Sequence, residues 1–138
     1  MSHSGRPHVE QKNEIVIMGY GDTLEGCFTS AATSMFGLMA DINDIHTLQI
    51  VTFEFEEPEP SRALTTWLNL LLTKAREHKL IFGDFRLMRT GDKWEATVSG
   101  EPWREALKRE FDIRRATTTT VDINKNSNLW EARCLVKI

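Results

Sequence analysis

The stretch EIVIMGYGDTLEGCFTSAATSMFGLM, from Glu14 to Met39, decides the fold of this chain. Residues 14–20 are β-branched and apolar on both faces, which predicts a strand that is covered on both sides. Asp22 is suited to cap a helix, and Glu25 can complete a capping box. Apolar residues at helical spacing follow and predict a helix of about 17 residues. They are Leu24, Cys27, Phe28, Ala31, Ala32, Met35, Phe36 and Met39.

A second strand and helix follow on the same plan. Residues 48–55 predict a strand with alternating apolar side chains. The acidic turn 56–60 then leads into a helix over residues 60–79. Pro60 suits the first turn of that helix, and acidic side chains suit its positive end. The apolar stripe of this helix consists of Leu64, Trp67, Leu68, Leu71, Leu72 and Ala75.

The last third of the chain is rich in strand formers and predicts two hairpins. The predicted strands are residues 84–89, 93–99, 112–123 and 129–138. Segment 101–110 fits either a short helix or a charged loop. Two helices and a run of hairpins predict an α+β domain, with a mixed, mostly antiparallel sheet covered by the two amphipathic helices. Residues 1–12 are polar and predict a mobile N-terminal arm before a single domain over residues 13–138.

Composition excludes several classes of protein. The 138 residues carry a net charge of −3, which excludes a generally basic protein that coats nucleic acid but leaves a local basic patch open. No apolar run is long enough to span a membrane, and the polar start is no signal peptide. Cys27 and Cys134 form no CxxC pair, which excludes zinc-ribbon and thioredoxin-type sites. Both lie on apolar faces and predict buried, reduced thiols, as in a reducing cytoplasm, over a disulfide or a nucleophile.

No motif in the chain carries a reaction by itself, and an enzyme with its own pocket is the weakest interpretation. The acidic run 54–59 favours a solvated loop and helix-end charge over a cation site. The basic run 104–115 favours a solvated face over a phosphate-binding patch. Trp103 lies in a charged segment, where an exposed tryptophan is a candidate contact for a partner. The histidines favour solvated or capping roles over metal binding, and they are His3, His8, His46 and His78.

Several segments, in chain order, resemble the archease family. YGDTLE at residues 20–25 and MFGLMAD at residues 35–41 resemble its first strand-to-helix turn and the end of its first helix. WLNLLL at residues 67–72 resembles its second helix. GEP at residues 100–102 and IRRAT at residues 113–117 resemble a turn and the strand that follows it. The likeness extends over nearly the whole chain.

This resemblance implies a function. Archeases are small accessory proteins of the tRNA-splicing ligase, which joins an RNA end that carries a cyclic phosphate to a 5′-hydroxyl end. They promote guanylylation of the ligase and its turnover, and they are not known as stand-alone enzymes. Their working site holds a divalent cation. Its ligands are an aspartate near the N-terminus, an aspartate in the last residues and the terminal carboxylate.

The sequence departs from the family at those ligand positions. Glu14 stands where the family has its N-terminal aspartate, and Lys137 stands where it has the second one. Arg114 replaces a lysine, which keeps the charge but not the geometry. Because a hard cation needs several oxygen ligands, we expect the site, for calcium or manganese, to be weakened or lost. Its residual positions are Glu14 and the carboxylate of Ile138.

Lys137 is open to two interpretations: it lies between Glu14 and the Ile138 carboxylate as a fixed positive charge, or it points to solvent. In both cases Glu14, Arg114, Lys137 and Ile138 are candidate partner-binding residues. The resemblance implies a chaperone-like, cytoplasmic accessory protein whose partner is an RNA-splicing ligase, without sequence-specific nucleic-acid binding or catalysis of its own. The alternative is a diverged binding or scaffold protein with no ligase-activating role. The sequence does not predict the oligomeric state.

Overall fold

A computed structural model describes residues 13–107 and 111–138, so the predicted arm over residues 1–12 lies outside the described residues. The two helices and six strands expected from the sequence are present, joined by two short 3-10 turns. In chain order the elements are β1 (Glu14–Gly21), α1 (Leu24–Met39), η1 (Ile42–Asp44), β2 (Gln49–Glu56), α2 (Pro60–His78), β3 (Leu80–Thr90), β4 (Lys93–Pro102), η2 (Glu105–Leu107), β5 (Arg115–Asn124) and β6 (Leu129–Lys137).

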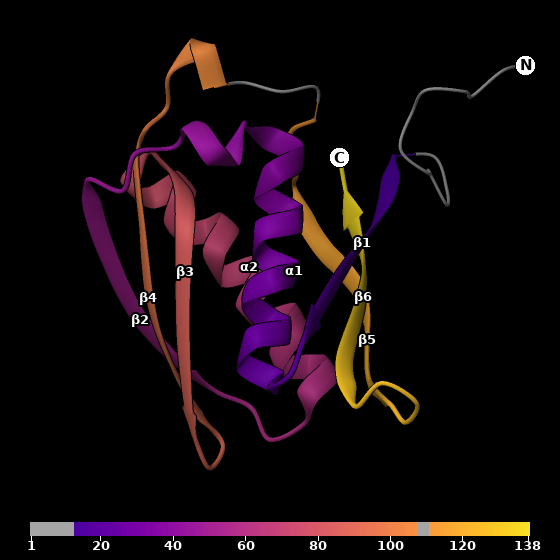
Figure 1. Cartoon of the computed structure of the whole chain (residues 1–138). Coiled ribbons are helices and arrows are strands. Elements are labelled where there is room, and N and C mark those ends of the chain that lie inside the picture. Colours follow the sequence, from indigo (N-terminus) through magenta and orange to yellow (C-terminus); the bar gives the residue numbers. More distant parts are fainter. Residues whose placement is uncertain (1–12, 108–110) are drawn as a thin grey trace, which may run out of the picture.

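The strands form two separate sheets rather than the single mixed sheet predicted from the sequence. One sheet has the order β1-β6-β5, the other has the order β2-β4-β3, and every pair is antiparallel. The two helices lie between the sheets (Figure 1). The α+β class with two covering helices is confirmed. The single sheet is wrong because β1 and β2 each pair with a strand from a later hairpin instead of with each other.

Helix α1 begins one residue later than the sequence predicted. Thr23 is the N-cap, and its side-chain oxygen accepts a hydrogen bond from the Gly26 backbone N–H at 3.0 Å. The predicted cap at Asp22 is therefore wrong. Gly21 explains the shift, since a Cβ atom there would lie 2.4 Å from the Cys27 backbone nitrogen. The chain between β1 and α1 passes so close to the helix that the cap falls on the next residue.

The two predicted hairpins differ from the structure at their outer ends. β3 begins at Leu80, four residues before the predicted start, because Lys79 adopts a left-handed conformation with φ of 57° and turns the chain directly from α2 into the strand. β5 begins at Arg115, later than predicted. The Arg76 guanidinium holds the carbonyls of Ile113 and Arg114 at 2.8 and 2.9 Å, which keeps both residues out of the sheet.

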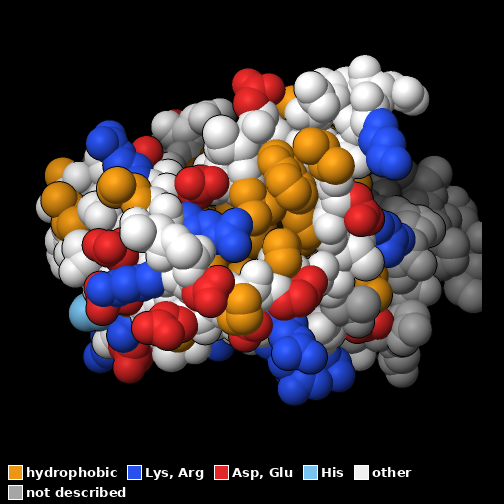
Figure 2. Space-filling model, turned by 90° about the horizontal axis from the view of Figure 1, so that it is seen from below, with side chains coloured by type: hydrophobic (Ala, Val, Ile, Leu, Met, Phe, Trp, Pro, Cys, Tyr) orange, Lys and Arg blue, Asp and Glu red, His pale blue; other side chains and the backbone are white. Residues whose placement is uncertain are grey.

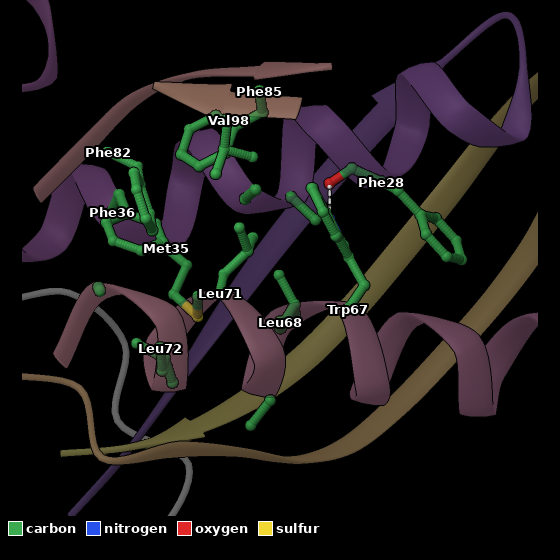
Figure 3. Packing of buried hydrophobic residues seen from close by; sticks show 14 of the residues in the cluster. Phe28, Met35, Phe36, Trp67, Leu68, Leu71, Leu72, Phe82, Phe85 and Val98 are labelled. Carbon is green, nitrogen blue, oxygen red and sulfur yellow. Dashed lines mark hydrogen bonds between the residues drawn. The ribbon is translucent and has the colours of Figure 1, made fainter. Parts of the chain in front are cut away.

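Both predicted apolar stripes are buried in one core between the sheets. Trp94 stacks on Phe28 with ring centroids 4.8 Å apart and an interplanar angle of 2°. Trp67 donates its indole N–H to the Phe28 carbonyl at 2.9 Å, which satisfies the polar atom of a fully buried ring. Figure 3 shows Trp67 and Leu71 of α2 reaching toward α1. Trp130 is partly buried against this core.

Side chains of the helices cover both outer edges of the β1-β6-β5 sheet. On the β1 edge, Ser30 accepts a hydrogen bond from the Tyr20 N–H at 3.1 Å, and Ser34 donates to the Met18 carbonyl at 2.8 Å. On the β5 edge, the Asn69 amide of α2 accepts from the Ala116 N–H at 2.8 Å and donates to its carbonyl at 3.1 Å. The helix side chains thus bind backbone groups that a further strand would otherwise bind.

Segment 101–110, left open by the sequence, contains an ion pair between the buried Glu101 and the exposed Arg104, and a 3-10 turn. Its residues 108–110 lie outside the described part. Glu101 is 3% exposed and receives the Arg104 Nε–H at 2.7 Å together with the His46 backbone N–H. These hydrogen bonds, that from Arg104 first, lower the pKa of Glu101 to about 2. The pair ties the end of β4 to the loop before β2.

The two cysteines are buried and unpaired, as predicted. Burial is the main cause that raises the pKa of Cys27 to about 11 and that of Cys134 to about 12. Both thiols are therefore protonated at neutral pH and poorly suited to act as nucleophiles. In the described part of the chain, neither helix has the length and apolar character needed to cross a membrane.

Candidate functional site

The first strand and the last strand of the chain bring the predicted site residues to one end of the β1-β6-β5 sheet. Glu14 and Arg115 both lie opposite Lys137 in the strand register. The Arg114 N–H donates to the Lys137 carbonyl at 2.6 Å, and the Ile138 N–H donates to the Asn13 carbonyl at 2.9 Å. Figure 1 shows the start of β1 and the C-terminus at the same end of the molecule.

We call this group the sheet-end cluster. It comprises Glu14, Arg114, Arg115, Thr117, Lys137 and Ile138. The structure thus brings all four candidate partner-binding residues together, on three adjacent strand ends. Glu14, Lys137 and Ile138 are half-buried, whereas Arg114 and Arg115 are exposed.

A bulge in β5 connects the two outer strands of the sheet. The register between β5 and β6 shifts between Ala116 and Thr118, which leaves Thr117 as the extra residue. The Thr117 hydroxyl lies 3.0 Å from the Leu135 carbonyl and 3.3 Å from Glu14 Oε2, so one proton is shared between these acceptors. Thr117 therefore reaches across β6 and orients the Glu14 carboxylate.

Helix α2 positions the basic part of the cluster. Asn69 pairs with both backbone groups of Ala116, and Arg76 binds the carbonyls of Ile113 and Arg114. These four hydrogen bonds fix the backbone immediately before and at the start of β5. Arg114 and Arg115 consequently present their exposed side chains from a rigid segment instead of a loose loop.

The sheet-end cluster carries more positive than negative groups. It contains three cationic residues, Arg114, Arg115 and Lys137, and two carboxylates, those of Glu14 and Ile138. Within residues 13–107 and 111–138, no ion pair joins Lys137 to either carboxylate. Lys137 therefore lies opposite Glu14 in the register without bridging the two acids.

The donor set of this cluster does not fit a divalent cation. Calcium takes six to eight oxygen ligands, and its affinity rises with the number of carboxylates. Glu14 accepts a hydrogen bond from Thr117, and the other acid of the cluster is the Ile138 carboxylate. The same cluster contains three cationic residues. Across the described ranges, no three His, Cys, Asp or Glu side chains gather as a metal site would require.

A cavity of about 540 Å³ is lined by the C-terminal ends of α1 and α2 and by residues 111–113, which precede β5. Its floor is apolar, and Trp103, predicted as a candidate partner contact, is 44% exposed at its side. Its lining residues are Phe36, Met39, Leu72, Ala75, Arg76, Lys79, Ile81, Trp103, Glu105, Phe111, Asp112 and Ile113. Arg76 thus borders both the cavity and the backbone of the sheet-end cluster.

The opposite end of the molecule presents apolar side chains between charged ones (Figure 2). There Trp130 lies in register with Gly21 on one side and Ile123 on the other. Tyr20 and Ile123 are 50% and 44% exposed. This apolar surface is separated from the sheet-end cluster by the whole length of the sheet.

The remaining charged runs have structural roles in the described chain. Glu59 caps α2 by accepting hydrogen bonds from the N–H groups of Ser61 and Arg62 at 3.2 and 2.8 Å. Glu54 pairs with Lys93 at 3.2 Å. In the basic run, Arg104 pairs with Glu101, and residues 108–110 lie outside the described part, as do His3, His8 and Gln11.

Sequence reasoning missed the residues that support the cluster, namely Asn69, Arg76 and Thr117. Asn69 offered a signal, since it is a polar residue inside the apolar WLNLLL segment of a helix that faces a sheet. Thr117 offered only its strand propensity as the first of four threonines. Its contact with Glu14 depends on a bulge that no local pattern predicts.

Comparison with known proteins gives one consistent result. The model of the Archease protein family (MTH1598/TM1083) matches residues 8–138. Protein archease of Methanosarcina acetivorans is 25% identical over 137 residues, which cover 95% of this chain and 94% of that protein. Protein archease of Thermococcus gammatolerans is 31% identical over 98 residues, which cover 68% of this chain and 69% of that protein.

Two solved structures share the fold. Protein 1598 of Methanobacterium thermoautotrophicum superposes with a TM-score of 0.73 at 20% identity, over 91% of this chain and 93% of that one. An archease of Thermotoga maritima, described as a possible chaperone, superposes with a TM-score of 0.68 at 13% identity, over 99% and 100% of the two chains. At these identities, the structural likeness shows a shared fold. The relationship to the family comes from the match to the family model.

Proposed function

This chain belongs to the archease family, and on that premise we propose that it is an accessory protein that promotes guanylylation of an RNA-splicing ligase and its repeated turnover. It acts by contact with the ligase and does not catalyse a reaction itself. The two thiols of the chain are buried and protonated, which fits this role better than nucleophilic catalysis. Two buried cysteines that form no disulfide with each other also fit a cytoplasmic location.

The observation that carries the proposal is the sheet-end cluster. Glu14, Arg114, Lys137 and Ile138 come from both ends of the chain and meet on one surface. The surrounding hydrogen bonds from Thr117, Asn69 and Arg76 hold that surface in a fixed form. A preformed, charged surface of this kind suits the docking of a partner protein, since little side-chain or loop freedom is lost on binding.

The charge of the cluster favours a second candidate function, that of a diverged binding or scaffold protein. A surface with Arg114, Arg115 and Lys137 around two carboxylates lacks the ligands for a divalent cation. If ligase activation needs that cation, this chain is a diverged binding or scaffold protein that keeps the fold alone. The two functions differ in one measurable property, the stimulation of a ligase.

The test is a ligation assay with the RNA-splicing ligase of the same source, RNA that ends in a cyclic phosphate, GTP and manganese. We expect more than one ligation per ligase only when this protein is present. Lys137→Ala should abolish the stimulation. Lys125→Ala, in the turn at the other end of the β5-β6 hairpin, is the matched control and should retain it. Failure of the wild-type chain to stimulate, beside a conventional archease that works, would support the scaffold function.

A further inference from the structure

The two sheets have four outer strands, which are β1, β5, β2 and β3. An outer strand presents unpaired N–H and C=O groups that can pair with another chain unless they are protected. The β1 edge is covered by Ser30 and Ser34, and the β5 edge is covered by Asn69. Each edge of the first sheet therefore has backbone groups that already bind a helix side chain.

The β3 edge is protected in another way. A register shift between Phe82 and Asp84 interrupts its regular pairing, and Asp84 forms an ion pair with Arg86 at 3.3 Å on the same strand. The Arg86 side chain is 78% exposed. Bulges and charged side chains are the usual devices that prevent an edge strand from pairing with another chain.

β2 lacks both kinds of protection at its beginning. Figure 1 shows β2 at the margin of the molecule, with no further described helix or strand beyond it. Within the described chain, no side chain forms a hydrogen bond to its backbone, in contrast to β1 and β5. Leu48 and Ile50 are 71% and 69% exposed. The acids Glu54 and Glu56 lie only in the second half of the strand.

We propose that residues 46–54, which comprise most of β2 and the three residues before it, are the interface of a two-fold symmetric dimer, in which they pair antiparallel with the same residues of a second copy. Centred on Ile50, this pairing places Ile50 opposite Ile50 of the second copy, so that the two exposed apolar side chains cover each other. It joins the β2-β4-β3 sheets of the two copies into one continuous sheet.

The sequence around Ile50 is complementary to itself in this register. Leu48 comes to lie opposite Thr52 of the second copy, and His46 opposite Glu54 of the second copy. The acids of the two copies lie at opposite ends of the interface, so like charges do not face each other. A partner that bound this strand through its negative charge would need only Glu54 and Glu56. The exposed Leu48 and Ile50 are better explained by a second copy.

Substitution at Ile50 tests the proposal in solution. We expect wild-type protein to sediment as a dimer and Ile50→Lys to shift it toward monomer, with a dissociation constant raised by at least about tenfold. The cause is that two lysines would face each other across the symmetry axis. Met88→Lys is the matched control, because Met88 is 70% exposed on β3, the other edge of the same sheet, and should leave the dimer intact.

A disulfide tests the register. Residues that lie directly opposite each other in antiparallel strands have Cα atoms roughly 4.5–5.5 Å apart, within the range that a disulfide spans. Ile50→Cys should therefore form a covalent dimer under mild oxidation, while Met88→Cys should not. The native thiols are buried and do not compete.

Three results would overturn the proposal. They are a monomeric wild-type protein at every concentration tested, equal dissociation of the Ile50→Lys and Met88→Lys variants, and equal cross-linking of the two cysteine variants. The interface lies on the sheet that does not carry the sheet-end cluster. Stimulation of a ligase and dimerisation are consequently read out separately, and failure of one leaves the other standing.

Discussion

Thr117 and Glu14 lie 103 positions apart in the chain, and the hydroxyl of one lies 3.3 Å from the carboxylate of the other. The contact crosses β6, so it links the two outer strands of a three-stranded sheet. It depends on the bulge in β5, because a regular strand would place no extra residue at this position. The orientation of Glu14 is thus set by a residue that lies 103 positions away in the sequence.

Replacement of this threonine should release Glu14. Thr117→Val keeps the shape of the side chain but removes its hydrogen bonds to Glu14 and Leu135. We expect a loss of about 1 kcal/mol in the free energy of unfolding, measured by urea denaturation. Thr120→Val, an exposed position on the same strand, is the control. Equal stability of the two variants would show that the Thr117 contacts are not stabilising.

Restoration of acids at the sheet-end cluster should restore cation binding. The double variant Glu14→Asp with Lys137→Asp places two carboxylates at directly opposed positions beside the Ile138 carboxylate. We expect calcium or manganese to raise its melting temperature, with a stabilisation of about 2.7 kcal/mol at a hundredfold excess over the dissociation constant. Wild-type protein and Lys125→Asp should not respond. A double variant indifferent to both metals would mean that these three positions do not converge on one ion.

Glu101 should contribute to the loss of stability of the protein in acid. Its pKa is lowered from 4.5 to about 2, first by the Arg104 hydrogen bond and then by the His46 N–H. The ionised form is therefore favoured by folding. Its contribution is fully present above pH 4.5 and is lost as the pH falls toward 2.

Glu101→Gln should flatten this part of the stability curve, whereas Glu105→Gln, at an exposed position in η2, should leave it unchanged. The measurement is the free energy of unfolding from urea titrations between pH 4.5 and about pH 2. An unchanged slope in Glu101→Gln would assign the acid sensitivity to other carboxylates.

The buried cysteines should be unreactive in the folded protein. Cys27 and Cys134 have pKa values raised to about 11 and about 12, mainly by burial. A disulfide reagent at neutral pH should label neither thiol until urea unfolds the chain. Met88→Cys, at a position that is 70% exposed and outside the proposed dimer interface, provides a positive control for labelling. Rapid labelling of the native wild type would indicate local opening of α1 or β6.

The same thiols weaken the fold in alkali. Because folding holds the protonated form, their contribution is fully present below pH 9, the ordinary thiol pKa, and declines as the pH rises toward 11 and above. Cys134→Ser should reduce that decline. Its unfolding free energy, followed between pH 8 and 10, should change less than that of the wild type.

Local patterns predicted the helices well and the sheets poorly. The stripe from Leu64 to Ala75 identified α2 because burial against a core imposes helical spacing on apolar residues. Pairing between β1 and β6 has no such local signature, since it is decided by contacts across nearly the whole chain. The cap at Asp22 failed for a related reason, because the close approach of Gly21 to the helix is a tertiary constraint.

For the candidate site, the sequence predicted the charged residues but not the residues that hold them in place. Glu14, Arg114, Lys137 and Ile138 followed from the family resemblance, and the structure gathers them at one sheet end. The groups that hold them, Asn69 and Thr117, lie in segments whose local pattern describes only a helix and a strand. Their roles depend on backbone groups that become available only where a sheet ends or bulges.

The composition of the first sheet has a consequence for biosynthesis. β1 leaves the ribosome well before β6, its strand partner in the described chain. The β2-β4-β3 sheet can close earlier, but the side of α1 that packs on β1 and β6 stays uncovered until β6 has been synthesised. Contacts with such large sequence separation slow folding and prolong the exposure of apolar surface. The apolar side of α1 is therefore the surface of the nascent chain that is exposed longest before the first sheet can form.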